Sequence, residues 1–114
     1  MELIYKICPA SDWEDARKTG EFRGSAVDFR DGFIHLSAPH QVRETARRHF
    51  AGQEDLVLVA FEAEDFGASL KWEASRGGDL FPHVYGVLPV DKARWVVQLP
   101  LDARGHVFPE EVPQ

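Results

Sequence analysis

The chain has 114 residues, a length typical of one domain, and we expect residues 1–114 to form a single unit with its core over about 3–99. Hydrophobic residues make up 44% and charged residues 28%, which excludes a disordered chain and allows an apolar core without disulfides. The net charge of −6 argues against a protein that follows the phosphates of extended DNA or RNA, but it leaves room for one small nucleotide.

Cys8 is the single cysteine, so no internal disulfide can form and a reducing compartment fits. Strand-like residues precede it and a proline follows it, which predicts a buried, inert thiol. The sequence shows neither a signal-peptide pattern nor an apolar run of about 18 residues. We therefore expect a cytoplasmic protein without a membrane segment.

The first strand is predicted over Leu3–Ile7, a run of β-forming residues. A helix follows between Pro9 and Gly20, with polar capping residues at its start and glycine at its end. Trp13 and Ala16 are three residues apart, so they are expected on the inward face of this helix.

The next segment, Phe22–Arg30, carries turn residues and is predicted to be irregular. A short strand is expected over Phe33–Leu36, directly after an Asp-Gly turn signal. Ser37 is predicted to cap a second helix, which ends at Gly52.

The remaining strands are predicted at Asp55–Phe61, Leu70–Glu73, Val84–Val87 and Arg94–Leu99. The first of these is apolar on both faces and is expected to be central. In the second, Trp72 is expected to point inward, with Lys71 and Glu73 on the opposite face. After Pro100, Gly105 can turn a hairpin. Two helices and about six short strands without βαβ alternation predict an α+β fold with a bent, mostly antiparallel, split sheet.

His35 is the first candidate functional residue. It lies in the short strand after Gly32, and Ser37 follows with a hydroxyl and backbone N–H groups close to a predicted helix start. Such donors suit an anionic or nucleotide-like ligand. A lone histidine on an apolar strand is equally typical of a packed core residue, so both interpretations stand.

The segment Phe81–Gly86 holds the second candidate group. His83 and Tyr85 are two residues apart and share one face of an extended segment. The tyrosine ring can stack on a planar ligand while the histidine contacts a sugar or phosphate oxygen. A packed aromatic strand is the alternative.

Glu73 is the best acidic candidate, because a carboxylate near the apolar Trp72 can stabilise positive charge on a sugar carbon or act as a base. Arg76 is a candidate phosphate contact through its fork of donors. For both, a solvated surface residue is the alternative. The basic cluster of Arg43, Arg47 and Arg48 with His49 is interpreted as a solvated helix face.

Metal, P-loop, Rossmann and hydrolase motifs do not occur in the sequence. His35, His40 and His83 have no metal-ligand spacing, and we expect no metal site.

Four segments together resemble a small bacterial family catalogued as domain of unknown function 952, some of whose members carry a glutathione S-transferase label. These segments are Ile4–Ile7, Asp31–Ser37, Leu70–Glu73 and Phe81–Gly86, and the similarity runs from about Leu3 to Leu99. The chain has no thioredoxin-like CxxC, which argues against the glutathione label.

The family is similar to the ADP-ribosyltransferase fold, in which a split sheet holds NAD. The resemblance implies that His35 contacts the ribose with Ser37 beside it, that Tyr85 stacks, and that Glu73 is the catalytic acid. Glu73 precedes the His83 segment, however, whereas the transferase glutamate stands on a late strand. The late strand of this chain offers Gln98 and no carboxylate there.

Three functions therefore stay open. The first is ADP-ribosyl transfer or a related NAD-consuming reaction, with His35 and Glu73 as catalytic residues. The second is binding of NAD or an ADP-ribose-like nucleotide without turnover, at His35, Ser37, His83, Tyr85 and Arg76. The third is a structural or partner-binding domain in which the histidines are only packed.

Overall fold

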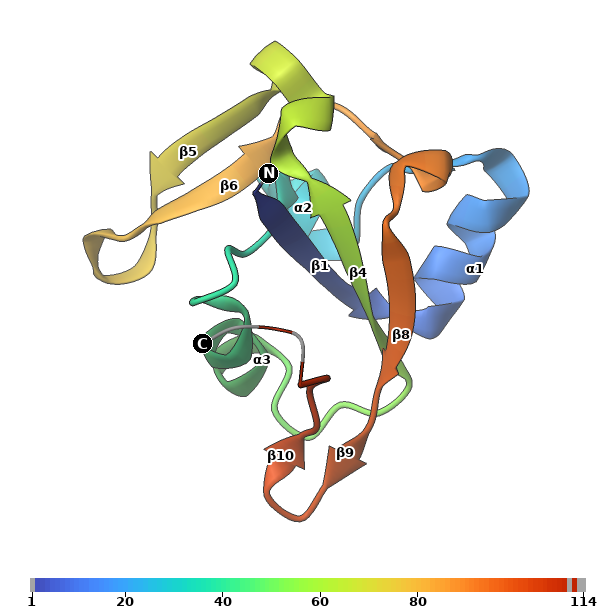
Figure 1. The fold of residues 1–114 in the computed structure, drawn as a ribbon, viewed down its shortest axis with the longest axis vertical. Coiled ribbons are helices and arrows are strands. Elements are labelled where there is room, and N and C mark those ends of the chain that lie inside the picture. The colour runs from blue at the N-terminus through green and yellow to red at the C-terminus, as the bar shows by residue number, and fades with distance from the viewer. Residues whose placement is uncertain (1, 111, 113–114) are drawn as a thin grey trace.

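The centre of the fold is an antiparallel sheet of three strands (Figure 1). β4 (Leu56–Glu62) lies between β1 (Leu3–Pro9) and β8 (Trp95–Leu99), and all 7 of its residues are buried. The apolar run of β4 thus takes the central position predicted for it. The computed structural model describes residues 2–110 and 112, without the side chain of Arg76.

A second antiparallel sheet has the order β3 (Ile34–His35), β6 (Leu80–Val84), β5 (Leu70–Ala74). It meets the first sheet beside β1, where the Tyr5 N–H donates to Ser37 O at 2.8 Å and the Ser37 N–H donates to Tyr5 O at 2.9 Å. Short pairs are β2 (Glu21–Phe22) with β7 (Leu88–Pro89), and β9 (Leu101–Asp102) with β10 (Gly105–His106). The predicted α+β class with antiparallel sheets is confirmed, and so is the hairpin at Gly105.

Apolar residues cover both faces of the central sheet because alternate residues of each strand point to opposite sides. On one face, Val59 and Phe61 pack with Trp13, and the apolar face of the second sheet joins this cluster through Ile34 and Val84. On the other face, Tyr5 and Leu58 pack against Val42 and Ala46. One face of the second sheet therefore packs against the core, and its other face carries polar side chains.

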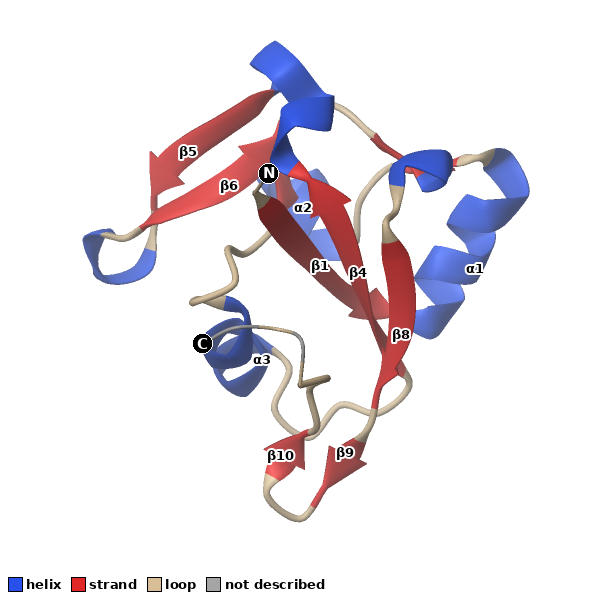
Figure 2. Cartoon of the chain, in the orientation of Figure 1, coloured by secondary structure: helices blue, strands red, loops and turns tan. Residues whose placement is uncertain are grey.

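Two main helices, α1 (Ala10–Thr19) and α3 (Val42–His49), flank the central sheet (Figure 2). Trp13 and Ala16 are buried, as predicted from their spacing. Short 3₁₀ helices span Ala63–Ser69, Arg76–Gly78 and Val90–Lys92. Among the helices of residues 2–110, none has the length and apolar character that crossing a membrane requires.

A third helix, α2 (Ala26–Asp31), lies where the sequence analysis expected irregular chain, so that expectation was wrong. Ser25 and Asp28 form a capping box, in which the Ser25 N–H donates to the Asp28 carboxylate at 2.8 Å. Gly32 ends the helix in the left-handed region, at φ 86°. The Ser-x-x-Asp spacing is a helix-start signal that was interpreted as a turn.

Two further expectations were wrong. α3 begins at Val42, and Ser37 does not cap it, because the backbone of Ser37 is paired with Tyr5 and a turn intervenes. The strand expected over Val84–Val87 lies earlier, at Leu80–Val84, because pairing with β5 and β3 on either side fixes its extent.

Candidate functional site: a cleft lined by two histidines

The polar face of the second sheet carries the two histidines singled out from the sequence. His35 and His83 are direct partners in the β3–β6 register, and their ring centroids lie 5.5 Å apart with the rings nearly perpendicular. Phe33 contacts both rings, at centroid distances of 4.6 Å to His35 and 4.2 Å to His83. Residues 48 positions apart in the chain thus form one aromatic cluster.

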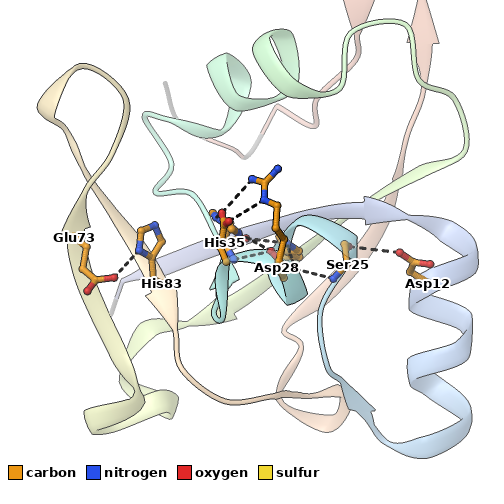
Figure 3. Close-up of polar contacts among 9 residues, drawn as sticks. Asp12, Ser25, Asp28, His35, Glu73 and His83 are labelled. Atoms are coloured by element: carbon orange, nitrogen blue, oxygen red, sulfur yellow. Dashed lines mark hydrogen bonds and ion pairs between the residues drawn. The ribbon is translucent and has the colours of Figure 1, made fainter.

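Asp28, at the start of α2, anchors His35. One carboxylate oxygen, Oδ1, lies 2.7 Å from His35 Nδ1 and accepts the His35 backbone N–H at 3.1 Å (Figure 3). The other oxygen, Oδ2, accepts from Lys6 Nζ at 2.8 Å and from the Ser25 N–H at 2.8 Å. Asp28 is only 2% exposed, and every donor around it favours the charged carboxylate.

The pKa of Asp28 reflects a contest between burial and these donors. Burial raises it, but the hydrogen bond with His35 and the charge and hydrogen bond of Lys6 outweigh burial and lower the pKa to about 2. Lys6 is itself buried, and it also donates to His35 O at 3.0 Å. His35 is therefore held through both its side chain and its backbone.

The second nitrogen of His35 faces another carboxylate. Nε2 lies 3.0 Å from Asp31 Oδ2, and Asp31 also pairs with the exposed Arg30 at 2.9 Å. The side chains of His35 and Asp31 remain 33% and 31% exposed, in contrast to Asp28. This side of the imidazole is therefore accessible.

His83 is held from the opposite edge of the second sheet, by β5. Its Nδ1 lies 2.7 Å from Glu73 Oε1, and the Tyr85 hydroxyl donates to the same oxygen at 2.8 Å. These hydrogen bonds lower the pKa of Glu73, with His83 the larger cause, and the bond to Glu73 raises the pKa of Tyr85. Within the part of the chain that the structure describes, His83 Nε2 has no hydrogen-bond partner.

Ser37 connects the second sheet to α3. Its hydroxyl lies 2.8 Å from Thr45 Oγ1, and Ser37 is 3% exposed. His49 follows Thr45 by one helical turn, so both side chains lie on the same face of α3.

These elements enclose a cleft of about 780 Å³, within the range typical of small-molecule sites. His35, Ser37 and His83 all line it. Its other polar lining residues include Lys6, Ser25, Arg30, Asp31, Thr45 and His49, and its apolar ones include Tyr5, Phe50 and Phe81.

The remaining predicted site residues lie elsewhere. Glu73 and Tyr85 are not among the lining residues. Glu73 is hydrogen-bonded to His83, which does line the cleft, and Tyr85 is hydrogen-bonded to Glu73. Lys71 and Glu73 share the face opposite Trp72, as expected, and Trp72 packs against the core. The Arg76 side chain lies outside the described residues.

Sequence reasoning missed Lys6, Asp28, Asp31 and Thr45. The Ser-x-x-Asp spacing could have identified Asp28, whereas Lys6 lies in an apolar strand that gives no local sign of an ion pair. His49, which the sequence placed in the basic cluster, is exposed and also lines the cleft. Arg47 and Arg48 are exposed as expected and pair with Glu44, whereas Arg43 is half-buried and lies over the ring of Phe108.

Two further features bear on chemistry. Cys8 is fully buried, as predicted, and burial raises its pKa to about 12, which disfavours the reactive thiolate. Over the described ranges, no group of three or more His, Cys, Asp or Glu side chains is placed to hold a metal ion.

The comparison with known proteins identifies the family. Residues 7–96 match the family described as Protein of unknown function (DUF952). The chain belongs to this family. No curated protein matches this DUF952 member significantly.

Solved structures agree with the family assignment. The crystal structure of protein CC0527 from Caulobacter crescentus is 55% identical, covers 91% of each chain and superposes with a TM-score of 0.88. The solution NMR structure of CC0527 is 55% identical, covers 93% of this chain and 91% of the other, and gives a TM-score of 0.83. The fold described above is thus similar to structures of a bacterial relative.

Proposed function

We propose that the protein binds a small nucleotide-like ligand, of the NAD or ADP-ribose class, in the cleft between α2, the second sheet and α3. The observation that supports this is the convergence of His35, Ser37 and His83 on one cleft of about 780 Å³. Imidazole and hydroxyl groups suit ribose and phosphate oxygens, and Arg30 adds a charged donor. The apolar walls suit a base.

ADP-ribosyl transfer is the reaction proposed for such a ligand, with His35 as the ribose contact and Glu73 as the acid. The transfer requires a carboxylate beside the sugar carbon whose bond to nicotinamide breaks. Glu73 Oε1 accepts hydrogen bonds from His83 and Tyr85, so Glu73 must leave these partners to act there. Release of nicotinamide from NAD by the wild type, lost in Glu73→Gln and in His35→Ala, would support the transfer.

Calorimetry tests the binding itself. NAD and ADP-ribose are titrated separately into the wild type, Ser37→Ala, His83→Gln and the control His40→Gln, whose residue is exposed and does not line the cleft. We expect binding by the wild type and the control, and binding weaker by about tenfold or more in the other two variants, since a hydrogen bond to a charged group contributes roughly 1.5–3 kcal/mol. Flat wild-type titrations with both nucleotides would refute the proposal.

A structural role for the histidines is the competing function, and the contacts of Phe33 with both rings favour it. In that case His83→Gln lowers the free energy of unfolding. The wild type then shows no heat of binding with either nucleotide, so the variants show no change in binding.

A further inference from the structure

His83 is built as a proton acceptor. A carboxylate at Nδ1 favours the tautomer with the proton on Nδ1, which leaves the lone pair of neutral imidazole on Nε2. Glu73 occupies Nδ1 at 2.7 Å, and the Tyr85 hydroxyl holds Glu73 in place at 2.8 Å. His83 is 4% exposed and lines the cleft, so a ligand in the cleft is what Nε2 can meet.

His35 is built as a proton donor. Its two ring nitrogens lie 2.7 Å and 3.0 Å from carboxylate oxygens of Asp28 and Asp31. Only the imidazolium form carries a proton on both nitrogens, so it alone satisfies both contacts. Asp31 is partly exposed and has Arg30 as a second partner, so a ligand oxygen can replace it at Nε2.

A base and an acid on paired strand positions, with ring centroids 5.5 Å apart, suit a reaction that takes a proton at one atom and delivers one at another. Release of nicotinamide needs no proton on its leaving group, whereas cleavage of a phosphodiester needs one on the departing alkoxide. Ser37 and Arg30 also line this cleft, and a hydroxyl and a guanidinium are both groups that can donate to phosphoryl oxygens.

We propose that the cleft hydrolyses a nucleotide phosphodiester, with His83 as general base and His35 as general acid. This inference rests on the proposed binding of a nucleotide-like ligand. Glu73 and Tyr85 are positioning residues for His83, and Asp28 is the positioning residue for His35.

The step balances without an oxidant or reductant. His83 Nε2 takes a proton from water while the water oxygen forms a bond to phosphorus. The bond from phosphorus to the leaving ribose oxygen breaks, its electron pair stays on that oxygen, and His35 Nε2 supplies the proton. The products are a phosphomonoester and a free hydroxyl, and a proton returns from His83 to His35 through solvent.

The test uses 2′,3′-cyclic AMP and the full chain, with the phosphomonoester quantified by chromatography. We expect turnover by the wild type and by the controls His40→Gln and Glu14→Gln, both at exposed positions that do not line the cleft. His83→Gln and His35→Gln are expected to lose about 100-fold or more in kcat, the usual range for an acid or base. The wild-type pH–rate profile is expected to be bell-shaped, and His83→Gln to lose the fall in rate on the acidic side.

Glu73→Gln and Tyr85→Phe test positioning. Glu73→Gln is expected to lower kcat by about tenfold while KM stays within about twofold, because Glu73 does not line the cleft and in this reaction acts through His83. Tyr85→Phe, at a partly exposed position, is expected to lower kcat in the same direction by less. A fall in stability alone would leave kcat of the folded fraction unchanged and would contradict both roles.

The outcomes separate this inference from the proposed function. Nucleotide binding in calorimetry without any phosphomonoester overturns the inference and leaves the proposed function standing. Turnover that survives undiminished in folded His83→Gln also overturns it. No binding of NAD, ADP-ribose or 2′,3′-cyclic AMP refutes both.

Discussion

Replacing Asp28 by asparagine is expected to destabilise the protein strongly. The substitution keeps the shape of the side chain but removes the charge that Lys6 faces at 2.8 Å. Both residues are about 97–98% buried, so the Lys6 ammonium is left without a counterion in the interior. Breaking a buried pair from one side costs about 3–5 kcal/mol, a large part of the roughly 5–15 kcal/mol that stabilises a typical domain.

Urea unfolding followed by tryptophan fluorescence measures this loss. With a slope of about 2 kcal/mol per molar, typical of small domains, the midpoint is expected to fall by about 2 M at pH 7. Asp15→Asn is the matched control, because the Asp15 side chain is 78% exposed and contacts Lys18 only at 3.9 Å. The double variant Lys6→Met/Asp28→Asn is expected to lose less than the sum of the two single variants, since it buries no lone charge.

The pH dependence gives an independent measure of the same group. The pKa of Asp28 falls from 3.8 to about 2 on folding, so its contribution is complete above the unfolded value and is lost as pH falls from about 4 to below 2. A shift of this size corresponds to about 2 kcal/mol. The stability gap between the wild type and Asp28→Asn should therefore narrow by about that amount between pH 5 and pH 2. A gap below about 0.5 kcal/mol at pH 7, or one independent of pH, would refute the reasoning.

Three other predictions concern single groups. Cys8 in the native protein should not react with a thiol reagent at pH 8, because it is fully buried and its pKa is raised to about 12. One equivalent of reagent should react after unfolding, and fast labelling of the native protein would contradict the prediction. Gly24→Ala should lower the free energy of unfolding, measured in urea, by about 1 kcal/mol or more, because φ of Gly24 is +127° and the new Cβ would lie 2.9 Å from Cβ of Asp28. An unchanged urea midpoint would show that α2 can move to accommodate the new methyl group. In an absorbance titration, Glu73→Gln should lower the pKa of Tyr85 towards its ordinary value, because the carboxylate that accepts the phenolic proton is removed. An unchanged pKa would mean that the hydrogen bond from the Tyr85 hydroxyl to Glu73 Oε1, at 2.8 Å, does not form in solution.

Local patterns were sufficient where a segment's structure depends on its own residues. β4 is apolar at nearly every position, which only a central strand accommodates, and Trp13 and Ala16 have the spacing of one helix face. Local patterns failed where a distant partner competes. Ser37 has the chemistry of a helix cap, but its backbone pairs with Tyr5 and its hydroxyl contacts Thr45, so it cannot cap.

The same distinction applies to the candidate site. The sequence alone singled out His35, Ser37 and His83, because a strand histidine beside a hydroxyl is visible over a few residues. It could not show that His35 and His83 are partners in one register, since strand pairing is set by the whole sheet.

By itself, then, the sequence determined the α+β class and the central strand, and it made His35, Ser37 and His83 candidates, because these follow from composition and short-range patterns. Only the tertiary structure decided that Asp28 and Glu73 each bind one imidazole nitrogen and that Lys6 neutralises Asp28 from β1. Hydrogen bonds and ion pairs act over about 3 Å in space, so these contacts depend on which distant residues the fold brings together and not on local sequence.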